Sequence, residues 1–378
     1  MKKDKLVIAI YSFFTSLSYS LMLYSIRNFG YNDVYYSYFL TCVNFGILFS
    51  SLVYGNIKIN EKNYFLYNFI GFFAILLSFF FLYYAENFFY LLLSSIFMYF
   101  LGSSINFIII RSKKDISLYY YFSLYGLFGL LAIQIFLFLN LNFKIIVLLS
   151  FFFVFLSIIF LFSFYFKKLL KILFYYFAEE YGILATTEKI LNYIENEDGS
   201  DLFKFVGKPS KISIINFIIA FFYLIYWTAL ITISSAYNTF FPIFLFLNNL
   251  GLTVSYKILP KKENNVDLFL NSLYGLILRF FGVLFLLFIY NIGFYNVLLL
   301  SLFYLLASIS WGIFSFYMDD YILNKKENEY GFVSFFRNLA AILGSIFVGI
   351  FGINLSLIFS IFVFLLILIL IFIFRKYI

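Results

Sequence analysis

The chain has 378 residues, of which 64% are apolar and only 12% are charged. A soluble domain is nearer half apolar and a quarter charged, so this composition excludes a soluble globular fold. The single cysteine, Cys42, and the lack of histidine exclude a disulfide framework, a thiolate metal site and catalysis by a histidine base. The formal net charge of +8 would favour nucleic acid as a partner of a soluble protein. Here the basic residues lie between apolar segments, which indicates membrane orientation instead.

Apolar segments follow one another along the whole chain. A membrane-spanning helix needs about 20 mainly apolar residues. The first such segment is expected to be an uncleaved span, because no small-x-small cleavage site follows it. Charged and turn-forming clusters separate twelve predicted spans, at residues 6–25, 34–56, 64–85, 88–110, 117–140, 144–166, 212–236, 239–259, 267–290, 294–318, 331–353 and 355–374.

Basic residues alternate between the segments that connect these spans. Cytoplasmic loops retain positive charge during insertion. With the N-terminus inside, 23 of the 26 Lys and Arg residues fall on the inner side. Only Arg27, Lys144 and Arg279 do not, and Arg279 lies within the ninth span. The pattern predicts an even number of spans, a multi-pass protein of the plasma membrane, and both termini in the cytoplasm.

A long polar segment, residues 167–211, divides the spans into two sets of six. We therefore predict an all-α membrane protein with two pseudo-symmetric six-helix bundles, over residues 1–166 and 212–378, joined by a cytoplasmic linker. The start of the linker, residues 167–174, is basic and amphipathic. It either lies on the inner leaflet or continues the sixth span into the cytoplasm.

Polar side chains concentrate on one face of spans one, four, seven and ten. Residues three or four apart share a helix face. Two six-helix halves around a central cavity would have a polar helix at every third position, so we expect these faces to line a substrate cavity. The alternative is that the small and polar residues only pack the helices together. The candidate cavity residues are Tyr11, Thr15, Ser18, Ser95, Tyr99, Asn106, Tyr223, Tyr226, Trp227, Ser234, Tyr304, Ser308, Trp311 and Ser315.

Charged residues near the spans are few. Arg279 lies about 18 Å into the bilayer at 1.5 Å per residue. It contacts either an anionic substrate or a structural partner such as a carbonyl or a tyrosine hydroxyl. We expect Lys58, Asp319 and Arg337 at an inner gate, with a lipid headgroup contact as the alternative for Arg337.

Carboxylates are not expected deep within any span. Transport would then be facilitated or driven by the gradient of the substrate itself, and a strongly cationic substrate would find no buried acid. Proton coupling through a rim carboxylate such as Asp33 is the alternative.

The segment Glu329–Gly344 is similar to the Gly-rich start of the eleventh span in the major facilitator superfamily, and the chain resembles that family over nearly its whole length. The stretch from Gly55 to Lys62 keeps the glycine and basic residues of the family's loop between spans two and three but lacks its Asp. The resemblance implies two six-helix halves that rock about a central site lined by spans one, four, seven and ten. It also implies a peripheral ninth span, which favours the structural role for Arg279.

We therefore expect a secondary or facilitative transporter of a small neutral or weakly anionic solute. The alternatives are a lipid or amphiphile translocase or drug efflux carrier on the same fold, and a non-transporting membrane scaffold. Enzyme activity is not expected, because Ser and Tyr nucleophiles would lack a group to activate them. We expect a monomer without cofactor or metal, whose partners are a small-molecule substrate and membrane lipids, and no nucleic acid.

Overall fold

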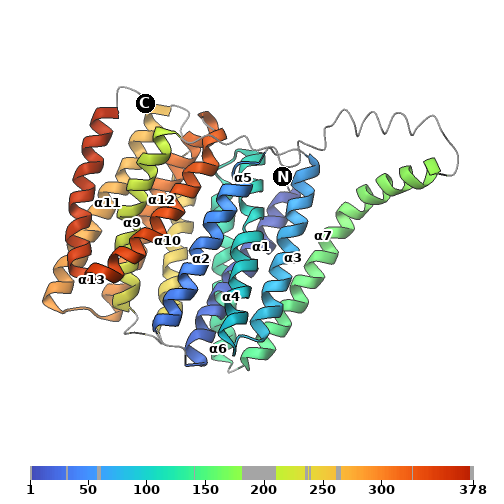
Figure 1. Cartoon of the computed structure of the whole chain (residues 1–378), viewed down its shortest axis with the longest axis horizontal. Coiled ribbons are helices and arrows are strands. Elements are labelled where there is room, and N and C mark those ends of the chain that lie inside the picture. Colours follow the sequence, from blue (N-terminus) through green and yellow to red (C-terminus); the bar gives the residue numbers. More distant parts are fainter. Residues whose placement is uncertain are drawn as a thin grey trace.

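The protein folds into a bundle of long helices (Figure 1). Lys58, one of the predicted gate residues, lies outside the described residues, as does most of the predicted linker. The computed structural model describes residues 2–30, 33–57, 61–139, 141–180, 210–234, 237, 240–260, 265–325 and 327–374.

The helices follow the predicted spans within a few residues at most ends. In the first half they are α1 (Lys2–Asn28), α2 (Asp33–Tyr54), α3 (Glu61–Tyr83), α4 (Phe88–Ile96), the π-helical turn η1 (Phe97–Gly102), α5 (Ser104–Lys113), α6 (Leu118–Phe138) and α7 (Phe143–Glu180). In the second half they are α9 (Lys211–Ser234), α10 (Phe241–Ile258), α11 (Asn265–Ile292), α12 (Val297–Lys325), the short 3-10 turn η4 (Glu327–Glu329) and α13 (Tyr330–Phe374).

Two helices are longer than the predicted spans. Helix α7 continues to Glu180, so residues 167–174 extend the sixth span, which is the second of the two alternatives for this segment (Figure 1). Helix α13 covers the last two predicted spans. Within it, Gly352 has φ 74° and ψ 170°, a conformation that glycine adopts without steric cost. This residue divides α13 into two segments that run in different directions (Figure 1).

The composition of the helices is that of a multi-pass membrane protein. In the described part of the chain, eight helical segments are long and apolar enough to cross a membrane, and Tyr38–Tyr54 and Tyr67–Tyr83 form shorter apolar helices. Large apolar side chains stand exposed along α7, among them Phe152, Phe153 and Ile159. Such a surface suits lipid and would aggregate in water.

The two halves meet along two pairs of helices. Within the first half α1 packs on α6 and α3 on α7, and within the second half α9 packs on α13 and both α10 and α11 pack on α12. Between the halves, α2 packs on the first part of α13, and α6 packs on α10. The N- and C-termini lie at the same end of the bundle, the upper end in Figure 1, which we call the terminal end.

The prediction that the spans contain no buried carboxylate is wrong. The tenth span was expected to end at residue 318, but the apolar helix runs from Val297 to Asn324 and includes Asp319 and Asp320. Both are buried, with 3% and 7% of their surfaces exposed. The helix continues because Tyr321, Ile322 and Leu323 are apolar and buried. The protein therefore has a buried acid. The argument against a cationic group in the substrate, which required that no such acid be present, no longer holds.

Candidate functional site

A cavity of about 370 Å³ lies between the two halves, within the range of small-molecule sites. Helices α5 and α6 of the first half and α10, α12 and α13 of the second half contribute its wall. The lining residues are Asn106, Phe107, Tyr119, Phe122, Ser123, Asn249, Leu252, Tyr256, Trp311, Ser315, Asp319, Tyr330, Ser334, Arg337 and Asn338.

A buried ion pair stands in this wall. Nη1 of Arg337 on α13 lies 2.5 Å from Oδ1 of Asp319 on α12. The guanidinium also donates from Nε and Nη2 to Oδ1 of Asn216 on α9, at 3.0 and 2.6 Å. Its carbon lies 5.8 Å from the centre of the Trp311 ring. Buried charges persist only when they are paired and hydrogen-bonded, and each charge here supplies what the other needs.

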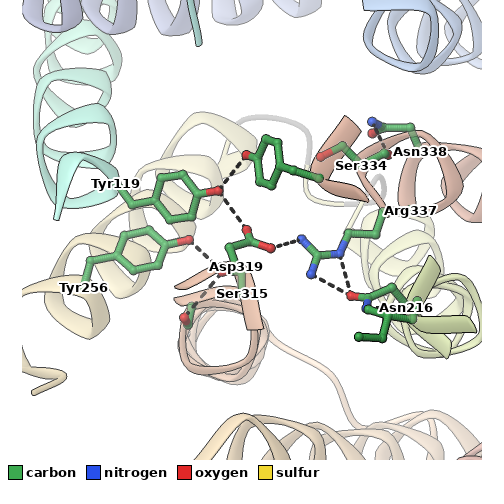
Figure 2. Close-up of polar contacts among 11 residues, drawn as sticks. Tyr119, Asn216, Tyr256, Ser315, Asp319, Ser334, Arg337 and Asn338 are labelled. Atoms are coloured by element: carbon green, nitrogen blue, oxygen red, sulfur yellow. Dashed lines mark hydrogen bonds and ion pairs between the residues drawn. The ribbon is translucent and has the colours of Figure 1, made fainter. Parts of the chain in front are cut away.

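Tyrosine hydroxyls connect this ion pair to the other half of the protein (Figure 2). Tyr119, near the start of α6, donates to Oδ2 of Asp319 at 2.8 Å. Its hydroxyl also lies 3.0 Å from that of Tyr330 on α13. The Tyr119 ring lies 5.5 Å from the ring of Tyr256 on α10. We call Tyr119, Asn216, Asp319, Tyr330 and Arg337 the polar cluster. It joins α6 of the first half to three helices of the second.

Beside the polar cluster, the backbones of the two halves touch. A Cβ atom added to Gly331, at the start of α13, would lie 2.4 Å from the backbone C and O atoms of Gly55, just after α2. The segment that follows α2 is held in place by Arg111, which donates to the carbonyl of Ile57 at 2.6 Å. The two halves are therefore in close contact at the terminal end.

Five of the predicted site residues meet at this cavity. Asn106 comes from the row on the fourth span, and Trp311 and Ser315 come from the row on the tenth. The predicted gate residues Asp319 and Arg337 form the ion pair. Oδ1 of Asn106 is buried and has no hydrogen-bond partner among the described residues.

The predicted residues of the first span, and Ser95 and Tyr99 of the fourth, lie in the packing of the first half. Thr15 donates to the carbonyl of Tyr11 at 2.7 Å, and Ser95 donates to the carbonyl of Leu92 at 2.8 Å. Ser18 and Tyr99 are buried. In this conformation these side chains do not line the cavity, and their contact with a substrate stays a prediction.

The predicted residues of the seventh span, and Tyr304 and Ser308 of the tenth, are packed in the same way within the second half. The hydroxyls of Ser234 and Tyr304 lie 2.7 Å apart, and the ring of Trp227 meets that of Tyr304 edge-on at 5.3 Å. The hydroxyls of the three remaining residues donate to backbone carbonyls. Tyr223 donates to the carbonyl of Ser310 at 3.2 Å, Tyr226 to that of Phe303 at 3.5 Å, and Ser308 to that of Leu305 at 2.8 Å. Their contact with a substrate likewise stays a prediction.

Arg279 has structural partners and is not among the lining residues of the cavity. It is 4% exposed, and Nη2 donates to the carbonyl of Ala307 at 2.6 Å. The guanidinium carbon lies 4.4 and 4.6 Å from the ring centres of Tyr223 and Tyr226. Cation–π contacts of this kind compensate part of the desolvation of a buried guanidinium. The partners are thus a carbonyl and tyrosine faces rather than tyrosine hydroxyls.

Sequence reasoning missed most of the polar cluster. Tyr119, Tyr330 and Asn216 were not singled out, although Tyr330 lies in the segment that resembles the start of an eleventh span. With 35 tyrosines in the chain, residue type alone could not distinguish Tyr119. Its partner Asp319 is 200 positions away, so only the fold could reveal the contact.

Solved structures superpose on nearly the whole chain. The human organic anion transporter MFSD10 (TETRAN) is 11% identical, with a TM-score of 0.65 over 97% of this chain and 98% of that one. A bacterial homologue of the iron transporter ferroportin, in an outward-facing state, is 12% identical, with a TM-score of 0.61 over 98% and 96% of the two chains. The same kind of homologue with soaked iron is 14% identical, with a TM-score of 0.60 over 97% of each chain. No protein-family model and no curated protein matches the sequence. The structural likeness shows that this chain has the fold of these solved transporters.

Proposed function

We propose that this chain, which has the fold of the major facilitator superfamily, is a secondary or facilitative transporter that moves a small solute by alternating access. The observation that carries the proposal is a cavity lined by both halves and bordered at the terminal end by contacts between them. Such a cavity changes its access when the halves rock.

The proposed topology has twelve crossings, two six-helix halves over residues 1–166 and 212–378, and both termini in the cytoplasm. The reversal at Gly352 supports two crossings within α13. The shared end of the N- and C-termini supports an even number (Figure 1). The excess of basic residues on that side supports a cytoplasmic orientation in the plasma membrane. The chain would act as a monomer, without a cofactor and without enzymatic activity.

The contacts between the halves at the terminal end have the properties of an inner gate. The hydroxyl of Tyr119 binds Asp319 across the interface, and a hydrogen bond to a charged group contributes about 1.5–3 kcal/mol. A contact of this size is weak enough to break during a transport cycle.

The cargo is proposed to be a small organic solute, neutral or weakly anionic, rather than a metal ion. The chain has no histidine, and no group of three or more Cys, Asp or Glu side chains gathers in its described part. Transition metals favour such ligands. Trp311 and Tyr256 instead offer aromatic faces, and Asn249 and Asn338 offer amide groups, which suit organic molecules.

Cysteine accessibility tests the proposed movement. Cys42 is replaced by alanine, and Ser123→Cys then places one thiol in the cavity wall. A membrane-impermeant thiol reagent is added to right-side-out and to inside-out vesicles. Alternating access predicts labelling from each side, with labelling from one side falling when that from the other rises.

A second thiol serves as the control. Asn142→Cys, in the loop before α7, should react from the outside alone. If Ser123→Cys reacts from one side only and proteoliposomes transport no solute, the chain would be a membrane scaffold and not a transporter.

A further inference from the structure

We propose, resting on the transport function above, that the solute is a small zwitterion. Its carboxylate would bind Arg337 and its ammonium group would bind Asp319. The proposal names a substrate class, an amino-acid-like molecule that carries both charges, and it assigns one residue to each charge.

The first support is the charge balance of the cavity. Among the fifteen described lining residues, only Asp319 and Arg337 carry charge, so the wall as a whole is neutral. A solute with net charge would enter a region of low dielectric without a matching countercharge, which is costly. A zwitterion meets no such imbalance, because each of its charges faces one opposite charge of the wall.

The second support is that both charged residues retain unused bonding capacity. A guanidinium has five N–H donors, and Arg337 uses three of them, two on Asn216 and one on Asp319. A carboxylate has about four acceptor positions, and Asp319 uses one on each oxygen, for Arg337 and for Tyr119. A zwitterion can therefore bind both residues while the ion pair remains intact.

The third support comes from the opposite half. Oδ1 of Asn106 is buried in the cavity wall and has no hydrogen-bond partner among the described residues. Such an acceptor is costly unless a donor reaches it, and an ammonium group supplies three donors. The ammonium group would thus connect Asn106 of α5 to Asp319 of α12.

Thermal unfolding of the purified full chain in detergent tests the proposal, since a ligand stabilises the state that binds it. Each protein amino acid is compared with its deaminated and its decarboxylated analogue; phenylalanine, for example, is compared with phenylpropionate and phenethylamine. We expect at least one amino acid to bind about tenfold more tightly than either analogue, since each lost charged hydrogen bond weakens binding by that order. Stabilisation by net-charged or uncharged compounds alone, or by none of the panel, overturns the proposal.

Two variants assign the charges. Asp319→Asn should lower the affinity for the amino acid about tenfold and should not lower that for the deaminated acid, because Arg337 then lacks a countercharge. Arg337→Gln should lower the affinity for the amino acid about tenfold and should not lower that for the amine. Asp320→Asn makes the same chemical change one position away, at a residue outside the cavity wall, and should leave the selectivity unchanged. Equal effects of Asp319→Asn and Asp320→Asn would overturn the assignment. If a variant does not fold, the wild-type panel still decides the substrate class.

The transport function and the zwitterion can fail separately. Transport of another kind of solute, together with labelling of Ser123→Cys from both sides, would support the transport function and refute the zwitterion as its substrate. Labelling from one side without flux would remove both.

Discussion

Replacing Gly331 with alanine adds a single carbon atom at the contact between the halves. The added Cβ would lie 2.4 Å from the backbone C and O atoms of Gly55, whereas ordinary contacts begin at 3.4 Å. The two backbones must therefore separate by about 1 Å, and overpacking of this kind costs about 1–3 kcal/mol. Alanine itself favours a helix over glycine by about 1 kcal/mol, so α13 should still form.

The cost falls only on the conformation in which the terminal end is closed. An energy of about 1–3 kcal/mol shifts a two-state equilibrium about 5- to 150-fold. The population open at this end should rise by that factor, and so should the rate at which Ser123→Cys reacts with an impermeant reagent from the cytoplasmic side. The background for the assay is the Cys42→Ala chain.

Gly349→Ala is the matched control for this prediction. It makes the same change in the same helix, and an added Cβ there meets no atom within 4 Å. It should leave the labelling rate unchanged. An unchanged rate in Gly331→Ala, or an equal rise in Gly349→Ala, would refute the inference that the glycine contact closes the inner gate.

Three further predictions concern the polar cluster and the buried arginine of α11. Tyr119→Phe removes the hydroxyl that binds Asp319 and should raise cytoplasmic labelling of the cavity about tenfold, whereas Tyr120→Phe should not; equal rates would contradict the gate. Arg337→Gln leaves Asp319 buried without its countercharge and should destabilise the protein by about 3–5 kcal/mol in thermal unfolding. The double variant Asp319→Asn, Arg337→Gln should lose less than the sum of the single variants, and strict additivity would count against the ion pair. Arg279→Lys should fail to restore stability relative to Arg279→Ala, because a lysine does not reproduce the flat contact with two tyrosine rings; full restoration would show that charge alone matters there.

The order and approximate limits of the helices could be predicted because each limit is a local property. Clusters such as Lys113 and Lys114 stop an apolar run wherever the rest of the chain lies. Asp319 shows where this reasoning fails. Two adjacent acids predict the end of a span, but the apolar residues after them continue the helix. The charge of Asp319 is compensated by Arg337, which lies on the next helix. A search for charge clusters along the sequence does not detect such a pair.

Part of the cavity wall could be predicted, and the reason for the limit is physical. Helical spacing identifies which residues share a face, but it does not say which neighbour that face meets. Small and polar residues serve a cavity and a close helix contact equally well. Trp311 and Ser315 lie at the cavity, whereas Tyr304 and Ser308 on the same face of α12 pack within their own half. The difference is one of depth along the helix, which periodicity does not encode.

The position of the ion pair has a consequence for the speed of the proposed cycle. Asp319, Arg337 and Asn216 all belong to the second half, so they move together when the halves rock. The bonds that must break at this place are those of the Tyr119 hydroxyl, an uncharged group. Separating two buried charges would add several kcal/mol to an activation barrier, and each 1.4 kcal/mol slows a step about tenfold. Because the charges travel as one neutral unit, the barrier to turnover contains no such contribution, and ionic strength should have little effect on the rate of the conformational step.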